Sequence, residues 1–357
     1  MAEQGHAGAD IGGGLRLVLL ATFPGMRALS WSEDVLYASR GYDLLKAQVG
    51  SGEIAWEFVG RWRPEWWREL TSRTRLGFRL VRDGFHTLAV LASGTLVAAV
   101  PGTIMTLAAG EREFRLTHRI TRGTRPLHIV ATPYGRVYWG EYFDNASRDE
   151  AHVYGSQDDG ASWQVVYTFA RGAIRHVHNV LYDKWADCLW VLTGDYGEEC
   201  RVLRASCDFS RVEVVLSGNQ QARAVAGVLA ADGLYFATDT PLEKNFVYRM
   251  GRDGGLAQLA ALSSSSIYGC SAGDALFFST MVEPSETNPD QNVRVYGARA
   301  GNNWNSMLAW KKDAWSMRFF QYGNAFFPDG ENTSGCLAVT TAAVQGADQM
   351  LSLFRVE

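Results

Sequence analysis

The chain has 357 residues, of which 47% are hydrophobic, and it carries a formal net charge of −4. This apolar content supports a large core, and the scattered basic residues do not predict nucleic acid or an anionic membrane surface as a partner. Five cysteines, an odd number without a CxxC pair, favour a reducing compartment over a disulfide framework.

The chain begins with a polar, glycine-rich stretch over residues 1–14, which we expect to be disordered. This stretch lacks the basic start and apolar run of a signal peptide, and no apolar run in the chain reaches the length of a membrane span. A cytoplasmic protein without membrane contact is therefore expected. Residues 15–357 are expected to form a single domain.

Strand-like apolar segments bounded by turn residues recur along the chain. Seven of them share one pattern, and they cover residues 34–39, 95–100, 136–141, 188–193, 233–238, 274–279 and 335–340. Each is followed by a second strand-like run, and several are preceded by a third. A period of roughly 40–60 residues that contains several strands is typical of propeller blades.

The sequence therefore predicts an all-β fold, a seven-bladed β-propeller, with six or eight blades left open. A β-sandwich, or two packed all-β domains, is the alternative that strand spacing alone does not exclude. Leu15–Ala21 has no hairpin partner nearby, and the last blade lacks an outer strand. We expect this N-terminal strand to complete the last blade and close the ring. Arg61–Arg75 breaks the pattern and predicts a short helix or loop insertion beside blade 2.

One turn is more specific than the others, Ser156-Gln-Asp-Asp-Gly-Ala-Ser-Trp163. Its Ser and Asp side chains can bond nearby amides, Gly160 can adopt a positive φ, and Trp163 supplies an apolar anchor. The run resembles the Asp-box of the sialidase-like (BNR/Asp-box) β-propeller superfamily, and Ser206-Cys-Asp208 resembles a decayed second copy. Because the resemblance places such turns at the outer edge of a blade, no catalytic role is assigned to this one.

In propellers of this kind, the start of each innermost strand and the end of the next strand meet on one face. Arg125, Arg175 and Arg223 each open an inner strand, one repeat apart. Guanidinium groups bind carboxylate or sulfate in a bidentate manner, although arginines at a repeated position can also tie blades together. The predicted substrate-binding residues are Arg125, His128, Arg175, Arg223, Asp239 and Tyr322.

The predicted catalytic residues are Glu141, Tyr142, His176, His178 and Asp195. Because residues i and i+2 of a strand point to the same side, His176 and His178 can act together, one of them as a base or ligand contact. No metal site is predicted, because a His-x-His pair without further ligands is a weak signal. A buried, satisfied histidine pair is the structural alternative. No P-loop or dinucleotide fingerprint occurs in a suitable setting, so no cofactor is predicted.

The resemblance implies a protein that acts on an acidic carbohydrate. A sialidase is similar in its arginine trio, but the F-R-I-P signature of that family is absent. A polysaccharide lyase would use an arginine, a histidine and Tyr142, whereas a glycoside hydrolase would pair Glu141 with Asp195 or Asp239. A uronate- or sialate-like glycan is the expected partner of such an enzyme. The alternative is a non-catalytic propeller that binds a glycan or a protein, with a role in polysaccharide assembly.

Overall fold

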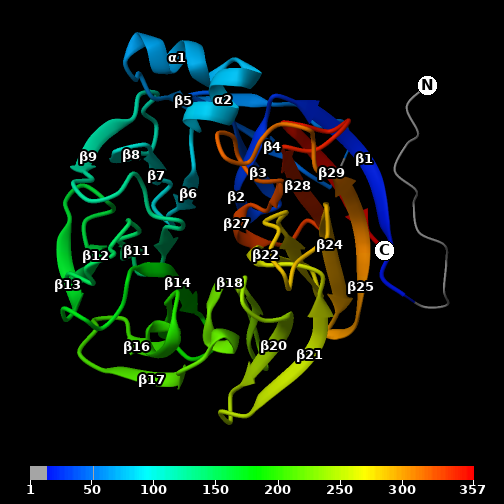
Figure 1. The fold of residues 1–357 in the computed structure, drawn as a ribbon. Coiled ribbons are helices and arrows are strands. Elements are labelled where there is room, and N and C mark those ends of the chain that lie inside the picture. The colour runs from blue at the N-terminus through cyan, green and yellow to red at the C-terminus, as the bar shows by residue number, and fades with distance from the viewer. Residues whose placement is uncertain (1–13, 51) are drawn as a thin grey trace.

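A computed structural model describes residues 14–50 and 52–357, and most of the segment 1–14 lies outside this range. The strands form seven antiparallel sheets arranged as a ring (Figure 1). The predicted seven-bladed propeller is confirmed. The seven segments on which that prediction rested are the second strands of the seven blades, counted outward from the centre.

Blades 1 to 4 follow the chain from the centre of the ring outward. Blade 1 consists of β2 (Arg27–Glu33), β3 (Val35–Arg40), β4 (Asp43–Gln48) and β5 (Glu57–Arg61). Blade 2 consists of β6 (Thr87–Val90), β7 (Leu96–Val100), β8 (Thr103–Leu107) and β9 (Arg115–Arg119). Blade 3 consists of β10 (Val130–Ala131), β11 (Val137–Gly140), β12 (Ala151–Ser156) and β13 (Gln164–Phe169). Blade 4 consists of β14 (Val177–Asp183), β15 (Cys188–Thr193), β16 (Arg201–Ser206) and β17 (Val212–Ser217).

Blades 5 and 6 repeat this order, and blade 7 departs from it. Blade 5 consists of β18 (Ala224–Ala230), β19 (Gly233–Thr238), β20 (Asn245–Gly251) and β21 (Leu256–Leu262). Blade 6 consists of β22 (Ser266–Ala272), β23 (Ala275–Thr280), β24 (Asn292–Arg299) and β25 (Asn302–Lys311). Blade 7 consists of β26 (Asn324–Phe326), β28 (Cys336–Ala342), β29 (Met350–Val356) and β1 (Leu17–Pro24). Two short 3-10 helices, η1 (Gly197–Glu199) and η2 (Gln220–Ala222), lie in the loops around blade 4.

The N-terminal strand closes the ring as predicted. β1 pairs antiparallel with β29, from Leu17 opposite Val356 to Pro24 opposite Met350, as Figure 1 shows. The first strand thereby covers the outer edge of the last one, so neither is left as an unpaired edge in blade 7. The apolar core is distributed between neighbouring blades, because each sheet buries both faces against the next sheet.

The sequence pattern did not predict β27 (Asp329–Asn332), which joins blade 1 as its innermost strand. It pairs parallel with β2, with Ser30 opposite Asp329, although the chain reaches it directly from β26 of blade 7. Its residues bond to other blades as well, since Thr87 donates to Asp329 at 3.1 Å and Asn332 donates to the Ser271 carbonyl at 3.3 Å. β27 therefore links several blades at the centre of the ring.

The predicted insertion is helical, and it lies between blades 1 and 2 (Figure 1). It contains α1 (Trp66–Ser72) and α2 (Arg75–Val81), and the hydroxyl of Thr74 caps α2 by accepting from Gly77 N. No helix in the described part of the chain is long and apolar enough to span a membrane.

The Ser156–Trp163 turn connects β12 to β13 at the outer edge of blade 3. Asp158 accepts from Ser162 N at 2.9 Å and from the Ser162 hydroxyl at 2.6 Å, while Ser156 Oγ accepts from Gly160 N at 2.8 Å. Gly160 has a φ of 81°, the left-handed conformation that the turn requires. Trp163 packs on Trp139, with ring centroids 6.1 Å apart. The turn is thus a structural element distant from the inner strands.

Candidate functional site

The polar residues that the sequence singled out lie mostly where the inner strands begin. We call this end of the ring the mouth. Each inner strand starts opposite the end of the second strand, as Val177 opposite Thr193 and Ala224 opposite Thr238 illustrate. Side chains from neighbouring blades meet there, in two groups.

The first group, which we call the histidine centre, consists of His176, His178 and Asp195. The Nε2 atoms of the two histidines are 3.1 Å apart, and each lies 3.5 Å from one oxygen of Asp195. All three side chains are more than nine-tenths buried. A His-x-His pair by itself shows no third ligand, but Asp195, in the loop that follows β15, supplies one, and the three groups are close enough to hold a metal ion.

Backbone carbonyls orient both imidazoles of the histidine centre. His176 Nδ1 lies 2.9 Å from the Phe143 carbonyl, and His178 Nδ1 lies 2.9 Å from the Ala224 carbonyl. Because a carbonyl oxygen only accepts hydrogen bonds, each Nδ1 must carry the donated proton. Burial lowers the pKa of His178, against the opposing effect of Asp195. In the neutral rings, each Nε2 therefore presents a lone pair toward the other and toward Asp195.

Two of the three predicted arginines converge on Asp195. Arg175 donates to Asp195 Oδ2 at 3.0 Å, and Arg223 Nη2 lies 3.3 Å from Asp195 Oδ1. Burial of the Asp195 carboxyl opposes ionisation, but hydrogen bonds from His176 and His178, when their Nε2 atoms are also protonated, outweigh it and lower the pKa of Asp195. Arg175 also pairs with the exposed Asp144. Both arginines are therefore engaged by carboxylates of the protein itself.

Asp239 lies beside this group as predicted, and it is buried. Arg223 Nη2 is 3.3 Å from Asp239 Oδ2, but burial, with a further contribution from Glu283, raises the pKa of Asp239 to about 7. Burial likewise raises the pKa of Glu283. The two carboxyl groups next to Arg223, those of Asp195 and Asp239, therefore differ in protonation at a mildly acidic pH.

Tyr142 covers the histidine centre. Its ring centroid is 4.3 Å from that of His176, and burial together with Asp239 raises its pKa to about 12. Glu141, the preceding residue, does not join this group. Its carboxylate accepts from Arg122 Nε at 3.0 Å and from His152 N at 2.9 Å, which satisfies it on the side of β12. The structure therefore brings together Tyr142, His176, His178 and Asp195, but not Glu141.

The third predicted arginine, Arg125, belongs to a different group, which we call the arginine cluster: Arg27, Arg82 and Arg125. They come from blade 1, from the end of α2, and from the segment that precedes β10. Burial, then the charges of Arg27 and Arg82, lower the pKa of Arg125 to about 10, so the residue remains charged at neutral pH. Within the described residues, these guanidiniums form no salt bridge with a carboxylate.

Arg27 and Arg82 were missed by the sequence analysis. Arg27 opens β2, the first strand of blade 1 along the chain, a position equivalent to that of Arg125, Arg175 and Arg223 in their repeats, and this equivalence was the available signal. Arg82 had no such signal, because it ends the helical insertion in a left-handed conformation with a φ of 59°.

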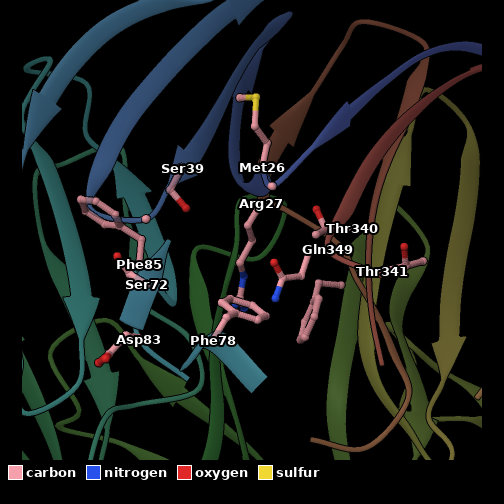
Figure 2. Close-up of a pocket in the computed structure, with 14 residues that line it drawn as sticks. Met26, Arg27, Ser39, Ser72, Phe78, Asp83, Phe85, Thr340, Thr341 and Gln349 are labelled. Atoms are coloured by element: carbon pink, nitrogen blue, oxygen red, sulfur yellow. The ribbon is translucent and has the colours of Figure 1, made fainter. Parts of the chain in front are cut away.

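Arg27 extends into a pocket between blades 1, 2 and 7, which we call the arginine pocket (Figure 2). Its lining also includes Phe78, Asp83, Phe326 and Gln349. One Arg27 nitrogen donates to the His86 carbonyl at 3.1 Å, and the guanidinium lies 4.4 Å from the Phe326 ring centroid. Two buried donors in this pocket have no acceptor, Arg27 Nε and Gln349 Nε2. Asp83 is already bonded to Tyr42 and Arg68.

The remaining predicted residues, His128 and Tyr322, lie apart from the histidine centre. His128 Nδ1 is 3.0 Å from Asp329 Oδ1 in the central strand β27, so this histidine contacts β27 rather than the other two histidines. Burial and the charge of Glu283 raise the pKa of Tyr322, whereas the charge of Arg82 lowers it. Tyr322 therefore lies on the side of the mouth that carries Arg82.

Comparison with known proteins shows the fold alone. Neither a family model nor a curated protein matches this chain. Among solved structures, the β-propeller domain of Cps50 (Swd1) from Myceliophteria thermophila is similar with a TM-score of 0.59 and 10% identity, over 96% of this chain and 100% of that chain.

Two further structures are similar to a comparable extent. The WD40 β-propeller domain of Doa1 gives a TM-score of 0.55 at 10% identity, over 95% of this chain and 96% of that chain. A chain of a mitotic checkpoint complex gives 0.57 at 11% identity, over 94% of each chain. The fold is thus shared with WD40 propellers, and the sialidase-like resemblance rests on the Asp-box turn and the residues around it.

Proposed function

We propose that this protein is a non-catalytic binding propeller that holds an acidic ligand, an acidic saccharide in the first instance, at the mouth. The observation that carries the proposal is the arginine cluster. Arg27 and Arg125 are half-buried and Arg82 is exposed; like charges brought together in this way repel one another, and among the described residues Asp83 and Asp329 offset them only from beyond salt-bridge distance. A carboxylate, sulfate or phosphate group of a ligand would supply the missing negative charge.

The arginine pocket supports the same proposal through its unused donors. Leaving a buried donor without an acceptor costs about 1–3 kcal/mol. Arg27 Nε and Gln349 Nε2 are two such donors in one pocket, and both can bond an oxygen of an anionic ligand. Because a guanidinium binds a carboxylate or sulfate through two parallel bonds, Arg27 is suited to this role.

Binding without turnover is favoured over glycoside hydrolysis because the expected carboxylate pair is not assembled. Glu141 faces Arg122, and Asp195 is engaged by two arginines. The comparisons add modest support, since one similar chain comes from a multiprotein complex, so a partner protein with an acidic segment is an alternative ligand. The fold by itself assigns no ligand.

A polysaccharide lyase is the second candidate, and a separate observation favours it. Tyr142, His176 and two arginines lie in one group, which matches a base, a proton donor and a carboxylate neutraliser. This group is distinct from the arginine cluster. Formation of an unsaturated uronate product from a uronate polysaccharide would identify the lyase by its ultraviolet absorbance, whereas released reducing ends without that absorbance would identify a hydrolase.

Calorimetry with defined probes tests the binding proposal. The probes are a uronate oligosaccharide, a sulfated oligosaccharide, their neutral counterpart and an acidic peptide. We expect an acidic saccharide to bind, added salt to weaken it, and the neutral counterpart not to bind. Arg125→Gln and Arg27→Gln should each weaken binding by roughly 10- to 100-fold, because a charge-assisted hydrogen bond contributes about 1.5–3 kcal/mol.

Arg211→Gln is the matched control, because Arg211 is an exposed arginine that contacts Glu213 on the outer part of blade 4. It should bind the probe as the wild type does. The proposal fails if no anionic probe binds, or if both arginine-cluster variants retain wild-type affinity. Binding of the acidic peptide alone would replace the saccharide with a protein partner.

A further inference from the structure

The histidine centre carries an inference that is independent of the arginine cluster. We propose that His176, His178 and Asp195 form a binding site for a divalent transition-metal ion, with Zn²⁺ as the favoured ion. Two imidazole nitrogens and one carboxylate are a ligand set that Zn²⁺ accepts, and such three-ligand sites leave a fourth position open. His178 lies in β14, His176 directly precedes β14, and Asp195 lies two residues after the adjacent strand β15.

The distances among the two imidazole nitrogens and the Asp195 carboxylate oxygens are close to those around one shared ion. Atoms bound to a tetrahedral Zn²⁺ at about 2.0–2.1 Å lie about 3.3 Å from one another. Here the two Nε2 atoms are 3.1 Å apart, His176 Nε2 lies 3.5 Å from Asp195 Oδ2, and His178 Nε2 lies 3.5 Å from the other oxygen, Oδ1. One ligand atom from each of the three residues lies within 4.8 Å of the other two, so a modest shift of the carboxylate would bring one oxygen to both nitrogens.

The hydrogen bonds of the histidines indicate the same arrangement. The Phe143 and Ala224 carbonyls hold the Nδ1 protons, so both Nε2 lone pairs point at the same place. A metal-bound histidine almost always donates its other ring proton in this way, which fixes its orientation. Two buried lone pairs 3.1 Å apart repel each other, and a cation between them removes the repulsion. A proton on one Nε2, shared with the other Nε2, is the competing explanation for the 3.1 Å distance. It would use only one of the two lone pairs, whereas a metal ion would use both.

The surrounding charge can accommodate a dication. Arg175 and Arg223 lie on Asp195 and would repel an ion. However, Asp144 pairs with Arg175, and Asp239 lies 3.3 Å from Arg223, with Glu283 nearby. Each arginine therefore has a carboxyl partner besides Asp195, which offsets part of its positive charge at the site. Tyr142 lies over His176, with ring centroids 4.3 Å apart.

Metal titration of the full chain tests this inference without any saccharide. After treatment with a chelator and its removal, calorimetry with Zn²⁺ should give one ion per chain. His178→Gln and Asp195→Asn should each weaken Zn²⁺ binding by at least about 100-fold, more than the roughly 10- to 100-fold effect of losing an outer partner of a ligand. His152→Gln, a histidine that contacts Thr168 on the outer part of blade 3, should bind Zn²⁺ like the wild type.

X-ray absorption of the zinc-bound wild type supplies a readout that requires no variant, in case the ligand variants do not fold. The expected spectrum contains two imidazole ligands per ion, with oxygen completing the coordination. The inference is overturned if the wild type binds no Zn²⁺, if the spectrum lacks two imidazoles, or if His178→Gln folds and binds with unchanged affinity. None of these results bears on the arginine cluster, so the proposed binding function is tested separately.

Discussion

Arg79 of α2 donates to Asp313 Oδ2 at 2.5 Å, although 234 residues separate the two in the chain. Arg79 also contacts Asp348 at 3.2 Å and is fully buried. Asp313 follows the last strand of blade 6, and Asp348 lies between the last two strands of blade 7. Ion pairs therefore join the helical insertion to blades 6 and 7, and the neighbouring residues Phe78 and Gln349 line the arginine pocket.

Replacing Arg79 by Met should destabilise the protein by about 3 kcal/mol, measured by urea unfolding. Removing the fully buried partner of a buried ion pair is strongly destabilising, and here it leaves Asp313 with Lys312 and Asp348 with the half-exposed Arg75 as their remaining cations. Arg75→Gln is the control. Arg75 also contacts Asp348, at 2.6 Å, but it is half-exposed, so its loss should cost about 1 kcal/mol or less. Equal effects of the two variants would contradict the assigned role of the buried ion pair.

Asp239→Asn should stabilise the protein at pH 8 and leave it unchanged near pH 4. Burial raises the pKa of Asp239 to about 7, whereas an unfolded aspartate titrates near about 3.9. Between these values the folded state binds more protons, so the contribution of this group to the free energy of unfolding falls as the pH rises. The amide imitates the protonated acid, so the expected gain above pH 7 is on the order of 1–3 kcal/mol.

Thermal unfolding across the pH range checks this expectation, with Asp232→Asn as the comparison. Asp232 is half-exposed and pairs with Arg249 at 3.0 Å. Burial acts to raise the pKa of Asp232, but hydrogen bonds from Tyr235 and Arg249 outweigh it and lower the pKa. Its substitution should not stabilise the protein at pH 8. A gain for Asp232→Asn, or none for Asp239→Asn, would contradict the raised pKa of the buried carboxyl.

The sequence predicted the architecture well because blade strands are local. A second strand such as Cys188–Thr193 and its neighbours carry apolar alternation bounded by turns, and ring closure followed from one unpaired strand at each end of the chain. β27 could not be predicted in this way. Asp329–Asn332 reads as a polar loop, and it becomes a strand only because β2 offers it a free inner edge.

The candidate site was predicted only where its residues follow the repeat of the strands. His176, His178 and Asp195 follow the repeat, so their convergence was visible in the spacing. The direction of a side chain at a strand end is set by the loop beyond it, and this decided that Glu141 faces Arg122 instead. Arg82 depends on how the insertion folds back, which periodicity does not describe.

The Asp-box turn should contribute to stability through its tryptophan more than through its aspartate. Asp158→Ala removes hydrogen bonds at an exposed turn and should cost about 1 kcal/mol. Trp163→Ala removes a partly buried ring that contacts Trp139, and should cost about 2–3 kcal/mol. Asp208→Ala, in the equivalent turn of blade 4, serves as the comparison for Asp158→Ala. Equal costs for Asp158→Ala and Trp163→Ala in urea unfolding would contradict this ranking.

Removing residues 1–24 should open the ring and expose the edge of β29. The truncation deletes the ladder from Leu17 to Pro24, together with the contact of Phe23 with Trp56, whose ring centroids lie 5.3 Å apart. We expect a loss of about 3 kcal/mol or more, since the deleted strand carries several partly buried apolar side chains. The unpaired strand should also promote self-association, visible as a change in sedimentation.

A synthetic peptide of residues 15–24 should reverse the effect of this truncation, because an extended peptide can pair with an exposed sheet edge through its main chain. Rescue of the thermal unfolding temperature, saturable in peptide concentration, is the expected result. A peptide of the same composition in scrambled order is the control, since the β1–β29 register places specific apolar residues against blade 7. Equal rescue by both peptides, or a truncated chain as stable as the full one, would show that β1 does not hold the ring closed.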